Sequence, residues 1–462
     1  MTSHVGGLWQ AGAMPTTDLP SAVELPSAVE LLSQAIRFDT SNFGSGRSHG
    51  ERPMAEWIAG LLTEAGWEPQ VLHRDEDPER ANVVVRVPGQ DRSLPGVLLH
   101  AHTDVVPVEA EHWNVPPFEG LVRDGYVYGR GANDMLNTVA AALHTLLVWG
   151  HRGIRPQRDV VVAFVADEED AGHWGAEWLA EEHPELFEGV GMAFGEDGAV
   201  GEPMVTHSGQ TVPVYVINAG ERGTMHIRLH ATGASGHGSR PTGKDAVSNL
   251  LRALHRILEH QFPLTLSEVV TGHYTQLAEA LEYPLEMGNE DSMAAFCAWL
   301  GDLAGPMPFT IRPTATPTVL KAGYKVNVVP GQASADVDVR CPPGTEQFVE
   351  QTLRELIGSE VKMEFLTRGA PLQSPIQGPW WDAMVAAVKR FDPQARVVPG
   401  CMGGGTDNKA FAKLGVVTYG FTPAPADPEG RRATGYHGID EKVPVSQVEG
   451  GAEWLRAFLE TV

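Results

Sequence analysis

Residues 159–166 read Asp-Val-Val-Val-Ala-Phe-Val-Ala and form the strongest strand pattern in the chain. A short run of continuous apolar residues predicts a strand that is buried on both faces of a sheet. Similar apolar runs occur at residues 82–87 and 96–100, and an Ala- and Leu-rich segment with helical spacing covers residues 138–149. Buried strands that alternate with helices are typical of an α/β domain whose sheet is covered on both faces.

The α/β pattern extends to both ends of the sequence. The further elements that it predicts are helices over 29–36, 54–62, 380–391 and from Val445, and a strand over 416–421. Residues 1–20 contain Gly, Pro, Thr and Ser and are predicted to form a loose arm.

A different pattern interrupts this domain near residue 220. Residues 224–231 alternate between apolar and polar side chains, as a half-exposed strand does. A helix, two alternating strands, a second helix and a strand follow at 245–260, 318–328, 333–340, 345–357 and 361–365. Residues 265–315 show little periodicity and are predicted to be an irregular excursion. We expect a small α+β unit that ends between residues 342 and 370.

The simplest architecture is a second domain inserted into the first, since 462 residues are too many for one compact core. With the boundary placed at residue 345, the α/β domain comprises residues 21–219 and 346–462, and the insert comprises residues 220–345.

Composition excludes several classes of function. The formal net charge of −25 argues against a nucleic-acid or anionic-membrane surface. The 3 cysteines are scattered and form neither a metal motif nor a disulfide framework, which fits a reducing compartment. The sequence shows neither a signal-peptide pattern nor an apolar run long enough to span a bilayer. We therefore expect a cytoplasmic protein.

Five short stretches carry acidic or imidazole side chains, and several of them follow a predicted strand. They are His102 with Asp104, Asp134 in a glycine-rich loop, Glu168-Glu169, Glu196-Asp197, and His437. Open α/β sheets place their sites at such strand ends. Histidines and carboxylates without cysteine favour zinc or manganese and suit hydrolysis, and a spare carboxylate could act as a general base.

Four of the five stretches also have a simpler interpretation. His102 and Asp104 could be a polar strand end, Asp134 could cap the helix that follows it, and His437 could be a surface residue. The doublet Glu168-Glu169 could belong to a solvated acidic loop, although four consecutive acids at 167–170 repel one another unless a cation is present. A serine nucleophile is the competing mechanism, but the chain has no Gly-x-Ser-x-Gly motif.

Taken together and in this order, the stretches resemble the di-zinc metallopeptidase family of aminoacylase-1 and carboxypeptidase S. This family also includes succinyl-diaminopimelate desuccinylases and acetylornithine deacetylases. The resemblance runs from about residue 30 to the end. Its motifs are Leu98-Leu-His-Ala-His102-Thr-Asp104-Val-Val-Pro107, Trp113 with Pro116-Pro117-Phe118, Gly129-Arg-Gly131 with Asp134-Met135, Asp167-Glu168-Glu169, Gly236-His237-Gly238-Ser239, Asn327-Val-Val-Pro330, Gly403-Gly-Gly-Thr-Asp407 and His437.

The resemblance implies two zinc ions per subunit, with manganese or cobalt as substitutes. Asp134 would bridge the two ions; the other ligands would be His102 and Glu196 for one ion, and Glu169 and His437 for the other. Asp104 would hold His102, and Glu168 would be the general base. Roles at the substrate end would fall to Asn327, Arg340, Gly404 and Thr406.

The resemblance also implies a fold and an activity. The catalytic domain would have a mixed sheet between helices, and the α+β insert would act as a lid and form a homodimer, in which His237 reaches the partner's site. The implied activity is hydrolysis of an amide bond in an N-acyl-amino acid or small peptide. A dipeptidase or carboxypeptidase is the first alternative, and a binding protein that has lost catalysis is the second. One departure is Leu136-Asn137, where the family often has Lys-Gly.

Overall fold

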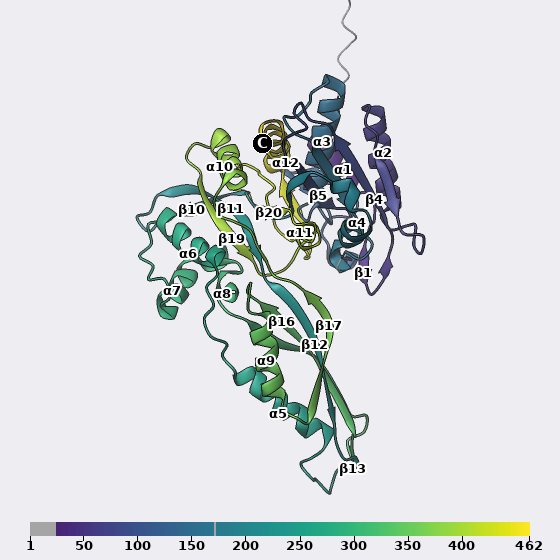
Figure 1. The fold of residues 1–462 in the computed structure, drawn as a ribbon, viewed down its shortest axis with the longest axis vertical. Helices are drawn as coiled ribbons and strands as arrows, with labels where there is room; N and C mark the ends of the chain where they lie inside the picture. The colour runs from purple at the N-terminus through teal and green to yellow at the C-terminus, as the bar shows by residue number, and fades with distance from the viewer. Residues whose placement is uncertain (1–24, 171) are drawn as a thin grey trace, which may run out of the picture.

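The computed structural model describes residues 25–170 and 172–462, and the arm predicted at residues 1–20 lies outside this part. The large unit is built on a ten-stranded mixed sheet (Figure 1). Its main path runs β10-β11-β20-β9-β5-β8-β4-β3, and β18 and β19 also pair with β11. The strands are β3 (Gln70–His73), β4 (Ala81–Val87), β5 (Gly96–His102), β8 (Val160–Val165), β9 (Val190–Gly195), β10 (Gly201–Val205), β11 (Thr211–Glu221), β18 (Leu372–Gln373), β19 (Arg396–Met402) and β20 (Val417–Gly420).

The centre of this sheet confirms the prediction from the apolar runs. Every residue of β5 and β8 is buried. These two strands are parallel, and β9 is parallel to β5 on its other side. Three neighbouring strands therefore end at the same edge of the sheet, whereas β4 runs antiparallel to β8.

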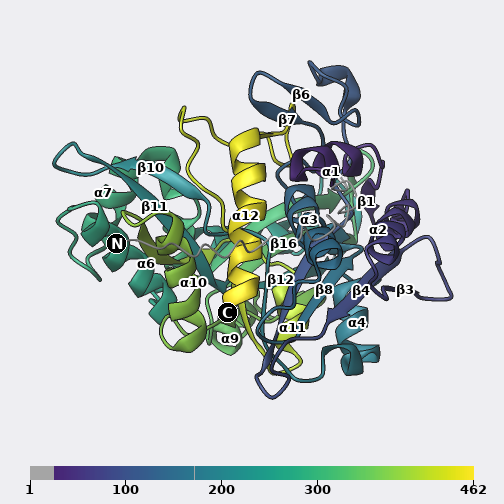
Figure 2. The ribbon, with the colours of Figure 1, turned by 90° about the horizontal axis from the view of Figure 1, so that it is seen from above.

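Helices cover both faces of the sheet, as expected. On one face, α1 (Ala28–Ala35), α3 (Leu136–Arg152) and α12 (Val445–Thr461) pack together, with α2 (Arg52–Glu64) and α10 (Pro379–Phe391) beside them (Figure 2). On the other face, α4 (Ala176–Glu182) and α11 (Asn408–Ala412) pack over the alternate side chains of β5 and β8. Among the residues that the structure describes, no helix is long and apolar enough to cross a membrane.

The small unit extends away from the large one (Figure 1). It is an antiparallel sheet in the order β14-β16-β12-β17, and α5 (Ala246–Glu259) and α9 (Glu346–Ile357) cover one face. The strands are β12 (Gly223–Thr232), β14 (Thr314–Ala322), β16 (Gln332–Cys341) and β17 (Val361–Gly369). Burial alternates along β12 and β16, as their sequence pattern predicts.

The structure corrects the boundary that the sequence analysis placed at residue 345. Both α9 and β17 belong to the small unit, because β17 pairs with β12 and α9 contributes Val349 and Leu353 to its core. Residues 361–369 therefore do not belong to the large unit.

The prediction of an irregular excursion at residues 265–315 is also wrong. This segment forms α6 (Glu268–Ala280), α7 (Glu290–Leu300) and α8 (Met307–Thr310). The side chains of Ser267 and Asn289 cap the first two helices. Their apolar side chains, among them Val269 and Phe296, join the core of the large unit rather than that of the insert. The excursion is an addition to the large unit.

Short strands complete the described part of the chain. They are β1 (Asn42–Gly44) with β2 (Arg47–Ser48), β6 (Leu121–Arg123) with β7 (Tyr126–Tyr128) and β21 (Lys442–Pro444), and β13 (Gly236–His237) with β15 (Val328–Val329).

Candidate metal centre

Three parallel strands bring the predicted ligands to one edge of the large sheet. His102 is the last residue of β5, Glu168 and Glu169 lie in the turn that follows β8, and Glu196 directly follows β9. Because neighbouring parallel strands end side by side, these residues meet although they are far apart in the sequence.

The predicted ligands form two groups that share Asp134. His102, Asp134 and Glu196 have ligand atoms within 4.8 Å of one another, and so do Asp134, Glu169 and His437. His102 Nε2 lies 3.0 Å from Asp134 Oδ1, whereas His437 Nε2 lies 3.1 Å from Asp134 Oδ2. The two carboxylate oxygens of Asp134 thus face different groups, as a bridging ligand requires.

The loop that carries Asp134 is held by Glu441. This fully buried carboxylate accepts hydrogen bonds from the backbone N–H groups of Gly131, Asn133 and Asp134 at 2.8 to 3.0 Å. The Arg130 guanidinium donates to it at 2.7 Å. Since Glu441 is four residues after His437, it joins the loops of two candidate ligands. The helix-cap interpretation of Asp134 is wrong, because α3 has no side-chain cap and its N-cap residue is Met135.

Burial and neighbouring charges shift the pKa values of the side chains in and beside the two ligand groups. Burial acts to lower the pKa of His102, but its hydrogen bond to Asp134 and the charge of that carboxylate raise the pKa well above 6.5. Hydrogen bonds to Asp134 and Glu169 raise the pKa of His437 to about 10. Burial raises the pKa values of Glu168 and Glu196 well above 4.5. The site holds more carboxylates than its two imidazoles can neutralise.

The donor set fits divalent metal ions. Oε2 of Glu196 is buried and has no hydrogen-bond partner among the described residues, which suits a ligand atom. The ligands are imidazole nitrogens and carboxylate oxygens, the set expected for zinc or manganese. Asp167, Asp197 and His437 have positive φ angles of 69°, 59° and 55°, and such backbone strain clusters at functional sites.

Asp104 contacts His102 through a different atom from the one expected. The backbone carbonyl of Asp104 lies 3.0 Å from His102 Nδ1, whereas the nearer carboxylate oxygen is 3.7 Å away. The carboxylate instead accepts hydrogen bonds from the backbone N–H groups of Glu168 and Glu169, at 3.1 and 3.2 Å. Asn42 Nδ2 donates to it as well, at 2.9 Å. Asp104 therefore positions His102 and the acidic turn together.

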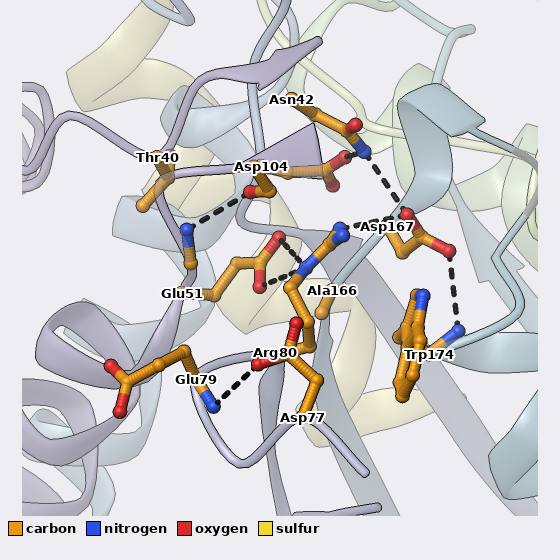
Figure 3. A network of polar contacts seen from close by, with 12 residues as sticks. Thr40, Asn42, Glu51, Asp77, Glu79, Arg80, Asp104, Ala166, Asp167 and Trp174 are labelled. Carbon is orange, nitrogen blue, oxygen red and sulfur yellow. Dashed lines mark hydrogen bonds and ion pairs between the residues drawn. The ribbon is translucent and has the colours of Figure 1, made fainter. Parts of the chain in front are cut away.

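A buried polar network supports this turn from behind (Figure 3). Asn42 Nδ2 also donates to Asp167, 3.1 Å away, and Arg80 Nη2 donates to the same oxygen at 2.7 Å. Arg80 Nε contacts both carboxylate oxygens of Glu51, at 2.8 and 3.1 Å. Arg80 is 1% exposed and Glu51 is fully buried, so each charge depends on its partner for stabilisation.

A cavity of about 890 Å³ opens beside the two groups. Its walls include Asp134, Glu168, Glu169, Glu196 and His437, and two residues predicted for substrate binding, Arg340 and Gly404. Thr406 does not line the cavity; its N–H and hydroxyl donate to the buried carboxylate of Glu221, at 2.9 and 2.7 Å.

His237 and Asn327 lie apart from the metal ligands. His237 is in β13, which lies at the far end of the small unit (Figure 1). The Gly238 N–H donates to the Asn327 carbonyl at 2.9 Å, so the two predicted residues are neighbours. Neither lines the cavity of its own chain.

Several positions that matter to the site were not assigned a role from the sequence. They are Glu441, Arg80 and Glu51, which are all buried. An Arg80–Glu51 pair gives no local pattern, because its members are far apart in the chain. Glu441 did leave a signal: it is an acidic residue in the same loop as His437.

Comparison with known proteins agrees with this fold. The model of peptidase family M20/M25/M40 matches residues 98–461. The human N-fatty-acyl-amino acid synthase/hydrolase PM20D1 is 29% identical over 93% of this chain and 86% of its own. Human aminoacylase-1 is 29% identical over 74% of each chain. The M20 family metallo-carboxypeptidase Sso-CP2 from Sulfolobus solfataricus has a TM-score of 0.65 and 16% identity over 94% of this chain and 99% of its own.

The fold and the paired ligand groups define a metal-dependent hydrolase. The chain belongs to peptidase family M20/M25/M40.

Proposed function

We propose that this protein hydrolyses the amide bond of N-acyl-amino acids, using two divalent metal ions. The observation that carries the proposal is the pair of ligand groups that share Asp134, in one cavity with Glu168. The names of the two sequence relatives, which act on N-acyl-amino acids, support this substrate class.

Glu168 is the proposed general base. Its backbone N–H is fixed by Asp104, its carboxylate lines the cavity, and it belongs to neither ligand group. A carboxylate with a raised pKa can take a proton from a water molecule and pass it to the leaving amine. The position of Glu168 in the cavity beside the two ligand groups therefore suits this role.

His102, Asp134, Glu169, Glu196 and His437 are the proposed ligands of two zinc ions. Bound divalent ions would lower the pKa of water and polarise the substrate carbonyl. The five side chains would fix the ions, and Asp104, Glu441 and Asn42 would fix the side chains.

Arg340 is the proposed contact for the carboxylate of the amino acid. Its guanidinium lines the cavity and is oriented by Asp338, at 2.8 and 3.2 Å, and by Thr224, at 3.0 Å. A guanidinium that is held in this way presents its remaining N–H groups with little loss of entropy. Gly404 would let the substrate backbone approach the opposite wall.

We also propose a homodimer that forms through the small unit. β14 is an edge strand of the four-stranded sheet, with Leu320 61% exposed, and Val326 after it is fully exposed. An apolar edge strand favours pairing with a second copy. His237 would then serve the partner's site and help to stabilise the oxyanion.

We also propose a cytoplasmic location. The three cysteines are buried, free thiols, which suits a reducing compartment.

Assay of the purified protein tests this function. Protein reconstituted with zinc should release amino acid from N-acetyl-methionine, and chelation should abolish the activity. Faster hydrolysis of simple dipeptides than of any N-acyl-amino acid would make the protein a dipeptidase instead. A complete metal complement with no hydrolysis of either substrate class would contradict the proposal.

A further inference from the structure

The helical excursion α6–α8 forms one wall of the cavity. Leu303, Ala304, Gly305 and Pro306, which connect α7 to α8, line the same cavity as the candidate metal ligands. The excursion is anchored on the large sheet, since Val269 and Tyr274 of α6 are buried in its core. This wall is therefore fixed to the sheet that carries the metal ligands.

The excursion also contacts the glycine-rich loop at 403–405 closely. A Cβ atom built on Gly403 would lie 3.2 Å from Cβ of Pro306, closer than most side chains pack. A Cβ atom on Gly220 of β11 would lie 3.3 Å from Val269 of α6. Gly403 and Pro306 both line the cavity, so their close contact helps to shape this end of it, whereas the contact at Gly220 holds α6 against the sheet.

This wall is apolar or uncharged. Leu303 and Pro306 line the cavity together with Met402 of β19 and Val216 of β11. Most of the acidic lining side chains belong to the metal ligands and their neighbours, and Glu202 of β10 is the exception. His273 of α6 also lines the cavity, and burial lowers its pKa to about 4, so it is neutral at pH 7. An uncharged wall favours a hydrocarbon group over a charged one.

The cavity is also larger than a short substrate needs. Cavities of roughly 300–1,000 Å³ hold molecules of drug size, and this cavity of about 890 Å³ lies near the upper end of that range. An N-acetyl-amino acid with Arg340 at its carboxylate would leave much of the space empty. The side chain of an amino acid has a bounded size, whereas an acyl chain does not.

We propose that the excursion α6–α8 forms a subsite for an extended apolar acyl chain, and that Leu303 and Pro306 set the chain length the enzyme prefers. This inference rests on the proposed amidohydrolase function. It adds the element of this chain that would hold and select the acyl chain, which does not follow from the metal ligands.

A chain-length series tests the subsite. N-acyl-glycines from acetyl to hexadecanoyl should show kcat/KM rising by about fourfold for each methylene buried, until the cavity is full. N-acetyl-amino acids of increasing side-chain size form the second series and should show a flat profile. Calorimetry of dodecanoate and propanoate binding to the zinc-loaded enzyme adds a readout without turnover, and dodecanoate should bind more tightly.

Variants locate the effect. Leu303→Trp should reduce kcat/KM for dodecanoyl-glycine by at least tenfold and leave acetyl-glycine unchanged, because only a long chain reaches the narrowed wall. Leu303→Ala is the second variant, in case the tryptophan variant does not fold. It should reduce the rise in kcat/KM for each methylene of the acyl chain. The matched control is Phe309→Trp, since Phe309 lies on the same excursion but is 59% exposed and does not line the cavity.

The outcomes separate the two proposals. A flat acyl profile in an enzyme that cleaves acetyl substrates would overturn the subsite and leave the amidohydrolase function standing. A profile that follows side-chain size instead, and that Leu303→Trp abolishes, would assign the wall to the amino-acid side chain and overturn the acyl proposal. No hydrolysis in either series would contradict the proposed function itself.

Discussion

The carboxylate of Asp104 accepts a hydrogen bond from the backbone N–H of Glu168 at 3.1 Å. The carbonyl of Asp104 lies 3.0 Å from His102 Nδ1. One residue therefore sets the position of a candidate ligand and of the proposed base. Because Asp104 is fully buried, water does not compete for these contacts. The base and the ligand are coupled through one residue, which uses its backbone carbonyl for His102 and its carboxylate for Glu168.

Glu168→Gln should retain both metal ions and lose about 10²–10⁴-fold in turnover. The amide keeps the shape of the side chain and its backbone contact to Asp104, but it cannot take a proton. Steady-state kinetics and elemental analysis of the same preparation test this. The matched control is Glu188→Gln, which makes the same chemical change at an exposed residue outside the cavity. Near-normal turnover at full metal occupancy would assign the base elsewhere.

Asp134→Ala should reduce metal content and activity together. Its side chain contacts both histidines, so its loss removes a ligand from each group. Glu196→Ala should affect only one group, because it belongs only to the group that contains His102. Elemental analysis after dialysis should show about two ions per chain for the wild type and fewer for Asp134→Ala. Unchanged metal stoichiometry in Asp134→Ala would show that Asp134 is not a shared ligand.

Zinc uptake by metal-free protein should release protons. Asp134 and Glu169 raise the pKa of His437 to about 10, so this imidazole is protonated at pH 7 without metal, and Asp134 shifts the pKa of His102 in the same direction. A metal ligand must be a neutral imidazole, so a protonated one gives up its proton on binding. Calorimetry in two buffers of different ionisation enthalpy should report this release, and zinc affinity should rise between pH 6 and pH 9.

The stability of the metal-free protein should change with pH in the opposite direction to its zinc affinity: it should fall as the pH rises. A histidine whose pKa is raised by folding stabilises the fold fully below its unfolded pKa of about 6.5. For His437, this contribution disappears as the pH rises through about 10. Metal-free protein should lose stability over this range, and the His437→Ala variant should lose less.

The calorimetry of zinc uptake has its own contrary outcome. A heat of zinc binding that is the same in both buffers would contradict the assigned protonation states.

Arg80→Met should destabilise the protein by about 3–5 kcal/mol, because it leaves the carboxylates of Glu51 and Asp167 without their buried partner. Urea denaturation at constant zinc concentration measures the loss. The double variant Arg80→Met/Glu51→Leu should recover part of it, since it removes one of the two stranded charges. A double variant that is less stable than the single variant would show that the network stabilises through packing rather than charge.

Most of the fold could be predicted because its signals are local. The apolar runs that predict β5 and β8 are buried along their whole length, and the alternation at 224–231 gives β12. The excursion could not be predicted in this way. α6 and α7 are short, Gly and Pro separate them, and their apolar faces are satisfied only by the large sheet. The boundary error had the same origin, because the pairing of β17 with β12 is non-local.

The candidate ligands could be proposed from the sequence because several of the stretches follow a predicted strand and because, taken together, they resemble a known family. Their grouping around Asp134 required three dimensions, and so did the finding that Asp104 uses its carbonyl towards His102. Arg80 gave no local pattern, because its importance lies in the distant groups that it contacts. Glu441 gave only its place in the loop of His437, and its contacts to Arg130 and the Asp134 loop required the structure.

His237 provides the test of the proposed dimer. It is exposed in β13, at the end of the small unit, and does not line the cavity of its own chain. His237→Ala and Glu168→Gln should each be inactive alone. Mixing the two should restore activity, because one of the two sites in a heterodimer then contains both wild-type side chains. Activity should also depend on closure of the small unit, since His237 must reach the carbonyl oxygen of the substrate.

Two measurements accompany the mixing experiment. Light scattering should show dimers, and native mass spectrometry of differently tagged chains should show that subunits exchange. With exchange complete, restored activity should approach a quarter of the wild-type value, since half of the chains form heterodimers and each of these has one competent site. A protein that is fully active as a monomer, or exchanged heterodimers without activity, would refute a histidine that acts across the interface.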